Sequence, residues 1–204
     1  MEYTYIPMGY DCSPAAALIN LGLRKMSLPF DWTQSTPELL IACIEDDFAN
    51  FHRNLQLIHN GQRVMDGYGI QFPHEYPTVD NKIVGVYNNY PENRIVDNYS
   101  DYTDDVLIKY ARRINRLRDF LKSDAPIIIL MRSSYGSACL MKNYIDKKYN
   151  KNVIIILATK YVSASSDNPL IICCDPEYQS VWNDKDVWEK AIIQGKAIYE
   201  KGVV

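Results

Sequence analysis

The stretches "APIIILMRS" (residues 125–133) and "NVIIILAT" (residues 152–159) decide the fold of this chain. Each is a run of branched apolar residues without the alternation that marks a strand with one face in water. Continuous runs of this kind are typical of strands buried on both faces, as in a parallel sheet covered by helices. The segment "SACLMKNYIDKKY" (137–149) between them is long enough for the connecting helix. The pattern predicts a strand, a helix and a second, parallel strand.

The same kinds of element continue toward both ends of the chain. A strand is expected from Tyr3 to Met8, and "NPLIICCDP" (168–176) contributes another apolar run. A last helix is expected from about Asp186 to Lys201. Strands that alternate with helices favour parallel pairing in the second half of the chain.

The middle of the chain is less regular. Residues 52–100 hold only short strand-like pieces, among them "YGIQF" and "KIVGVY". The following segment, residues 101–122, has apolar residues at helical spacing, and its acidic start suits the helix dipole. No linker divides the chain. We therefore predict an α/β fold, a single domain over residues 1–204, with a mostly parallel central sheet flanked by helices.

The composition limits the classes of function. A net charge of −3 gives no reason to expect nucleic acid or an acidic membrane as a partner. The first ten residues lack the pattern of a signal peptide, and no apolar run reaches the ~20 residues needed to cross a bilayer. Five cysteines without CxxC spacing and three histidines without an HExxH pair predict neither disulfides nor a metal site. We expect a cytoplasmic protein, and the oligomeric state is open.

The stretch "GYDCSPAAALINLG" (9–22) carries the main candidate for chemistry. Ser13 suits the N-cap of a helix, Pro14 its first turn and Gly22 its left-handed end. Cys12 therefore stands at the positive end of a helix dipole, which biases its thiol toward the thiolate, the form that attacks carbonyl groups. The alternative for Cys12 is a small core residue.

A cysteine nucleophile needs a base within hydrogen-bond reach and a group that orients the base. Among the histidines His74, in "YGIQFPHEYP" (68–77), is best placed because it stands at the end of a strand-like piece; a solvated loop residue is the alternative. Asp31 is the predicted orienting group, because an acid flanked by aromatic residues is partly buried and needs a partner. Asp11 is a second candidate, and capping of a backbone turn is the alternative role of Asp31.

Several basic residues are candidates for binding an anionic group of a substrate. Arg113 and Arg116 share a face of the predicted helix 101–122, although a solvated basic face is the commoner explanation. Arg132 follows a strand at the edge where the Cys12 turn should also lie. Together with Trp32 of "PFDW" (29–32), these arginines are the predicted substrate-binding residues.

Four segments, taken in order, resemble a known family. They are "GYDCSPAAALINLGLRKMSLPFDWTQS", "YGIQFPHEY", "YARRINRLRDFL" and "IIILMRS". They resemble a family of unknown function described as papain-like cysteine peptidases and found in bacteria and large DNA viruses. The resemblance covers about residues 3–135 and implies that Cys12 is the nucleophile and His74 the base. Glu75 stands where the family more often has aspartate, and a papain-like relationship implies an α+β fold as the alternative architecture.

The cysteine turn also resembles the nucleophile position of serine hydrolases with a GDS-type turn. A capsule-biosynthesis family thought to bind coenzyme A is similar in the same respect. The leading prediction is a papain-like cysteine peptidase or related thiol-dependent acyl hydrolase that acts on a peptide, glycan or small-molecule acyl group without a cofactor. One alternative is an acyltransferase or esterase acting on a glycan or a coenzyme A thioester, and another is a non-catalytic domain that binds protein or sugar. A viral source would place the protein in the host cytoplasm.

Overall fold

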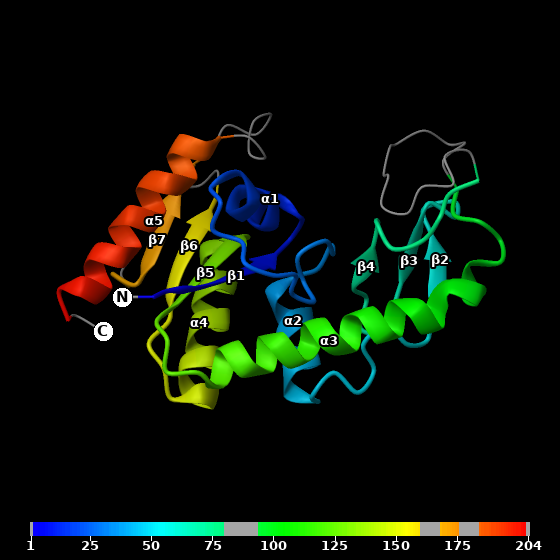
Figure 1. Cartoon of the computed structure of the whole chain (residues 1–204), viewed down its shortest axis with the longest axis horizontal. Helices are drawn as coiled ribbons and strands as arrows, with labels where there is room; N and C mark the ends of the chain where they lie inside the picture. The colour runs from blue at the N-terminus through cyan, green and yellow to red at the C-terminus, as the bar shows by residue number, and fades with distance from the viewer. Residues whose placement is uncertain (1, 80–93, 160–167, 176–183, 203–204) are drawn as a thin grey trace.

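A four-stranded sheet forms the centre of the computed structural model, which describes residues 2–79, 94–159, 168–175 and 184–202. Its strands lie in the order β1-β5-β6-β7, and every neighbouring pair is parallel (Figure 1). The strands are β1 (Thr4–Gly9), β5 (Ile127–Arg132), β6 (Ile154–Ala158) and β7 (Ile171–Cys174). The predicted α/β architecture with a mostly parallel sheet is confirmed, rather than the α+β alternative.

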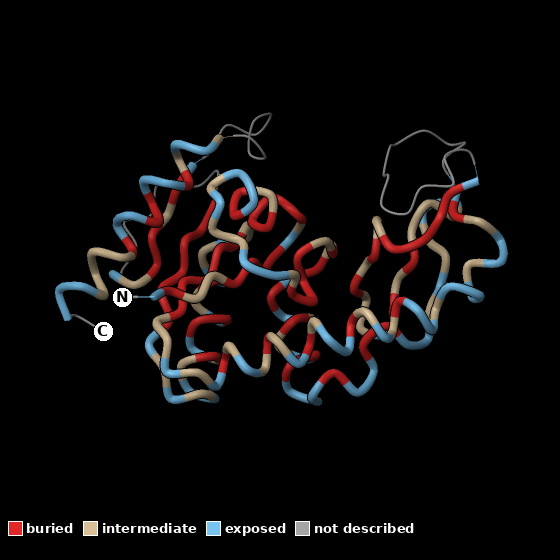
Figure 2. The backbone as a smooth tube through the Cα atoms, viewed as in Figure 1, coloured by how far each residue is buried: buried red, intermediate tan, exposed pale blue. Residues whose placement is uncertain are grey.

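The two apolar runs that predicted the sheet are its adjacent central strands, β5 and β6. Every residue from Ile154 to Ala158 is buried, and so is every residue of β5 except Arg132 at its end. Successive side chains point to opposite faces, so Ile129 packs into one apolar cluster and Ile128 into the other. The absence of polar alternation in these runs therefore reflects burial of both faces, which Figure 2 shows as continuous red strands.

Helices cover both faces of this sheet. One cluster contains residues of α1 (Ser13–Asn20) and α5 (Lys185–Glu200) together with one face of the strands. The other contains residues of α2 (Pro37–Glu45), α3 (Thr103–Lys122) and α4 (Tyr135–Tyr149) together with the opposite face. No helix in the described ranges has the length and apolar character that crossing a membrane requires.

A small antiparallel sheet lies beside the parallel one. It consists of β2 (Gln56–Ile58), β3 (Arg63–Met65) and β4 (Gln71–Phe72), in that order. Only the last two residues of the predicted piece "YGIQF" are in a strand, and "KIVGVY" lies outside the described residues. A short 3-10 turn, η1 (Tyr99–Tyr102), leads into α3.

Helix α3 connects the two sheets (Figure 1). The ring of Tyr110, in its first half, contacts Phe72 of β4, with ring centroids 5.6 Å apart. Its second half leads into β5 of the parallel sheet. The predicted apolar stripe is buried at Val106, Tyr110, Ile114, Leu117 and Leu121, whereas Leu107 is half-buried. The helix thus provides one surface against which residues from both sheets pack.

Phe48 lies beyond the end of α2, which stops at Glu45. Phe48 has a φ of 65° and still packs into the core, where its ring stacks on Phe30 at 5.8 Å. Burial of the ring, rather than helical geometry, accounts for the apolar residue at this position.

Candidate active site

The turn that carries Cys12 is held by a close approach between the ends of β1 and β5. Gly9 has a φ of 123°, and a Cβ atom there would lie 2.8 Å from the carbonyl oxygen of Arg132. The Tyr10 N–H donates to the same oxygen at 3.0 Å. Only glycine fits this conformation without strain. The approach places Cys12 at the carboxyl edge of the parallel sheet, where ligands of open α/β sheets bind.

Helix α1 starts one residue earlier than the sequence predicts. Its N-cap is Cys12, and Ser13, the predicted cap, is the first helical residue. Pro14 lies in the first turn as predicted, and Gly22 has the predicted positive φ, 67°, just after the helix. The capping prediction is therefore wrong by one residue, and the thiol belongs to the residue that begins the helix.

His74 lies next to Cys12. Its Nε2 atom is 3.6 Å from the Cys12 Sγ atom, although 62 residues separate the two in the chain. His74 follows β4 by two residues, so the small sheet brings the imidazole to the edge of the parallel sheet. The structure thus joins the two residues that the sequence selects as nucleophile and base.

Asp11 occupies the amino end of α1. Its Oδ1 atom accepts hydrogen bonds from the Ser13 backbone N–H at 2.9 Å and from the Ser13 hydroxyl at 2.6 Å. Its Oδ2 atom pairs with the Arg132 guanidinium. The Ser13 amide N–H is therefore engaged by a carboxylate of the turn itself.

The surroundings of the Cys12 thiol favour its neutral form. Only 4% of the residue is exposed, and burial raises the pKa of Cys12 to about 12, with the negative charge of Asp11 as the next largest cause. Desolvation therefore opposes the bias toward thiolate that the helix dipole predicts, and that bias stays a prediction.

Asp31 is fully buried, as expected of an acid between aromatic residues, but its contacts are not with His74. Its Oδ2 atom accepts hydrogen bonds from Arg24 Nε at 3.0 Å and from the Leu28 N–H at 3.0 Å. Its Oδ1 atom has no hydrogen-bond partner in the described residues. Burial raises the pKa of Asp31, and Arg24 opposes that shift. In this arrangement Asp31 orients the loop before Trp32, and its role as orienting group for the imidazole stays a prediction.

Trp32 borders the imidazole directly. The Trp32 and His74 rings meet edge to face with centroids 6.2 Å apart. The Arg24 guanidinium lies over the Trp32 ring, 5.7 Å from its centroid. Trp32, one of the predicted substrate-binding residues, therefore contacts the candidate base.

Arg113 and Arg116 make contacts within the protein. Arg113 Nη1 lies 3.5 Å from Glu75 Oε1, and Arg116 Nη1 donates to the Ser27 carbonyl oxygen at 3.2 Å. Neither residue lines the pocket at the sheet edge. Their predicted binding of a substrate anion stays untested, and the contacts assign them first to packing of α3.

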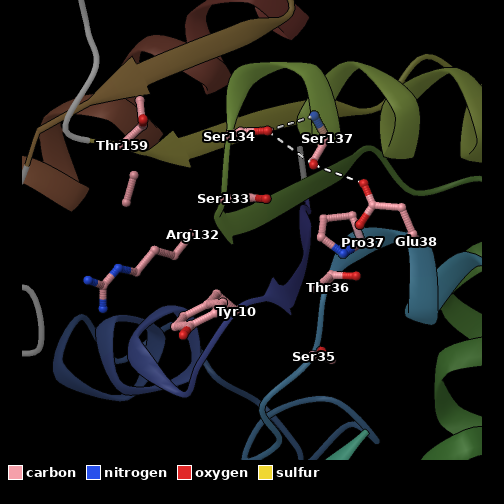
Figure 3. A pocket seen from close by; sticks show the side chains of 11 residues that line it. Tyr10, Ser35, Thr36, Pro37, Glu38, Arg132, Ser133, Ser134, Ser137 and Thr159 are labelled. Carbon is pink, nitrogen blue, oxygen red and sulfur yellow. Dashed lines mark hydrogen bonds between the residues drawn. The ribbon is translucent and has the colours of Figure 1, made fainter. Parts of the chain in front are cut away.

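A pocket of about 400 Å³ opens beside the Cys12 turn. Arg132 and Tyr10 line one side, and the starts of α2 and α4 line the other (Figure 3). Ser137 donates from its hydroxyl to Glu38 at 3.0 Å, and the Ser137 N–H donates to the Ser134 hydroxyl at 3.1 Å. Most of the lining residues carry a hydroxyl group: Tyr10, Ser35, Thr36, Ser133, Ser134, Ser137 and Thr159.

His52, in contrast to His74, is a buried structural residue. Its Nε2 atom lies 2.6 Å from the Tyr76 hydroxyl, and burial lowers the pKa of His52 to about 4. The unfolded chain takes up a proton near the ordinary pKa of 6.5, so His52 stabilises the fold above that pH, and this stability is lost as the pH falls toward 4.

We expect the wild type to lose roughly 2 to 3 kcal/mol more unfolding free energy than His52→Asn between pH 7 and pH 4.5. Asparagine tolerates the positive φ of this position, 56°. Urea unfolding of both proteins at a series of pH values measures the difference. Asp66, whose pKa burial raises to about 6, contributes with the opposite sign in both proteins and cancels in the comparison. If the unfolding free energies of the two proteins changed with pH in parallel, the assignment of a neutral buried His52 would be contradicted.

Two charged residues around the site were not selected from the sequence as site residues. Arg63 of β3 carries a positive charge that lowers the pKa of Cys12, although by less than burial raises it. Its Nη1 atom donates to Gln71 Oε1 at 3.0 Å. Glu75, next to His74, is buried against α3. Both residues reach the site through contacts between segments that are distant in the chain, and no local sequence pattern predicts such contacts.

The described residues contain no cluster of histidine, cysteine or acidic side chains that could hold a metal ion. All five cysteines are free. No curated protein and no solved structure matches the chain. A protein family does match, over residues 3–153 and thus over more than half of the 204 residues. The chain belongs to the family described as "Putative papain-like cysteine peptidase (DUF1796)".

Proposed function

We propose that this chain is a cysteine hydrolase in which Cys12 is the nucleophile and His74 the general base. The contact between Cys12 Sγ and His74 Nε2, 3.6 Å long, carries the proposal. A thiol and an imidazole at this distance form the minimal pair for nucleophilic acyl chemistry. Membership of a family described as cysteine peptidases supports the same class.

The reaction proceeds through a thioester. His74 accepts the thiol proton as Cys12 Sγ bonds to the substrate carbonyl carbon. The bond from that carbon to the leaving amine or alcohol then breaks, and the leaving group takes the proton from the imidazolium. In the second half, water attacks the thioester with His74 as base, the carbon–sulfur bond breaks, and the proton returns to the thiol.

The raised pKa of the thiol shapes the first step. Because burial raises the pKa of Cys12 to about 12, we expect the proton to move during attack rather than before it. This order resembles that of a serine hydrolase, in which the base acts on a neutral nucleophile. The position of the base then matters more than it would for a preformed thiolate.

An activated ester tests the proposal without knowledge of the natural substrate. With p-nitrophenyl acetate, we expect release of nitrophenolate together with an acetyl group on the peptide that contains Cys12, detected by mass spectrometry. Cys12→Ala should abolish both the adduct and the turnover, whereas Cys139→Ala, a change at a half-buried cysteine of α4, should preserve them. Acetylation spread over the other cysteines, with Cys12 unmodified, would contradict the proposal.

Acyl transfer is the second candidate, and the hydroxyl-lined pocket favours it. In that case an alcohol takes the place of water in the second step, and the product is an ester. The pocket begins at Tyr10, two residues before the nucleophile, and the hydroxyl groups among its lining residues are the observation that supports an acceptor such as a glycan. Adding a sugar to the ester assay separates the two functions, because transfer gives an acylated sugar and hydrolysis gives only the free acid.

A further inference from the structure

His74 lies in a short segment that is anchored on both sides. Before it, Phe72 is fully buried and packs edge to face on His52, with centroids 4.5 Å apart. After it, the Tyr76 hydroxyl lies 2.6 Å from His52 Nε2. His74 itself is only half-buried and faces the thiol. The direction of the imidazole therefore depends on how its neighbours are fixed.

Glu75 provides the strongest of these anchors. Only 4% of the residue is exposed, yet both carboxylate oxygens have partners. Its Oε1 atom accepts the Tyr110 hydroxyl at 2.8 Å and lies 3.5 Å from Arg113 Nη1, and its Oε2 atom pairs with Lys109. The partners span one turn of α3, so the residue next to the base is bound to a rigid helix at several points.

The charges make this anchor specific for a carboxylate. Lys109 and Arg113 stand four residues apart on α3 and repel each other. The negative charge of Glu75 compensates both, and its removal would leave two cations beside a largely buried site. A shorter acid keeps the charge but reaches less far toward the helix.

We propose that Glu75 is the positioning residue for His74, holding the imidazole against Cys12 by tying the backbone after β4 to Lys109, Tyr110 and Arg113 of α3. The inference rests on the proposed function, since it assigns the geometry of that same base. Glu75 does not touch the thiol or the substrate; it acts through the backbone it shares with His74. Helix α3 thereby joins the small sheet, which carries the base, to the part of the chain that leads into the parallel sheet.

The test compares Glu75→Gln, Glu75→Asp and wild type in two reactions of Cys12. Acetylation by p-nitrophenyl acetate at pH 7 needs the base, and we expect it to fall about 10-fold to 100-fold in Glu75→Gln, with partial recovery in Glu75→Asp. Alkylation by iodoacetamide at pH 10 needs no base, because hydroxide ionises the thiol, and it should stay at the wild-type rate. A purely structural role would loosen the site and accelerate alkylation instead.

A double-mutant cycle with His74→Ala tests whether Glu75 acts through the imidazole. If Glu75 acts through the imidazole, Glu75→Gln has no further effect on acetylation once His74 is absent. Full additivity of the two effects would overturn the inference. If His74→Ala alone left acetylation unchanged, the proposed function would fail; if it lowered acetylation and Glu75→Gln did not, only the positioning role would fail.

Asp146→Asn is the matched control for loss of a carboxylate from a polar network. Asp146 accepts the Val153 N–H at 2.8 Å and pairs with the buried Lys142 at 2.6 Å, at the amino end of β6. This network lies at the opposite end of the strands from the Cys12 turn. The control should lower the unfolding free energy while leaving the acetylation rate of folded protein unchanged, and a loss of acetylation in it equal to that in Glu75→Gln would overturn the positioning role.

Discussion

Replacing His74 with alanine is expected to lower the acetylation rate of Cys12 at pH 7 by about 10²-fold to 10⁴-fold. The reason is geometric and electrostatic. The imidazole Nε2 atom lies 3.6 Å from the thiol and is in position to take its proton. Without that base, attack depends on the small fraction of thiolate that a thiol with a pKa of about 12 provides at neutral pH. Single-turnover release of nitrophenolate, with mass spectrometry of the Cys12 peptide, measures the effect.

Two controls accompany the His74 variant. His59→Asn removes an exposed histidine at a position whose φ of 50° asparagine accepts, and it should acetylate at the wild-type rate. Free imidazole added to His74→Ala should restore part of the rate, because the deleted ring leaves space beside the sulfur, and it should not help Cys12→Ala. An acetylation rate within twofold of wild type in His74→Ala would remove His74 from the mechanism.

The parallel sheet was predictable because its signal is physical and local. Strands β5 and β6 are buried on both faces, which excludes polar residues from every position of the runs, and a helix-forming segment separates them. The small sheet gives no such signal. Strand β4 is only two residues long, and its pairing partner β3 is half exposed, so neither produces a periodic pattern.

The candidate site was predictable only in its parts. Gly9, Pro14 and Gly22 mark the turn and the helix around Cys12. Each of them acts through the backbone conformation at its own position, which the residue type predicts. The charge environment of the thiol depends on contacts that the sequence does not show. Asp11 turns its carboxylate onto the helix start, which offers a negative charge to the dipole in place of the thiol. Burial of the sulfur and the charge of Asp11 both raise the pKa of Cys12, whereas the helix dipole alone predicts a lowered one.

The architecture also qualifies the family description. A papain-like relationship implies an α+β fold, whereas Cys12 here follows the edge strand of a four-stranded parallel sheet. The likeness to papain therefore lies in the pairing of cysteine with histidine, in that order along the chain. Chemistry resides in sites that different folds can carry, and a strand-to-helix turn is a position that suits a nucleophile in α/β enzymes.

The reactivity of Cys12 toward iodoacetamide is expected to lack a plateau between pH 6 and pH 10 and to rise about tenfold per pH unit. Burial raises the pKa of this thiol to about 12, so at pH 7 it holds ~10³-fold less thiolate than an ordinary cysteine with a pKa of about 8.5. A more basic thiolate is a better nucleophile, which offsets part of this difference and leaves alkylation at pH 7 roughly 10²-fold slower than that of free cysteine.

Peptide mass spectrometry distinguishes Cys12 from the more exposed Cys139 and Cys173, which serve as internal references within the same molecule. If Cys12 instead reached a constant alkylation rate below pH 7, the resting pair would be a thiolate and an imidazolium. The positive end of α1 would then outweigh burial and the negative charge of Asp11, and the proton would already lie on His74 before the substrate arrives. An alkylation rate that rises throughout the range means that the proton stays on sulfur until attack. Catalysis at neutral pH then depends on the placement of His74 against the thiol.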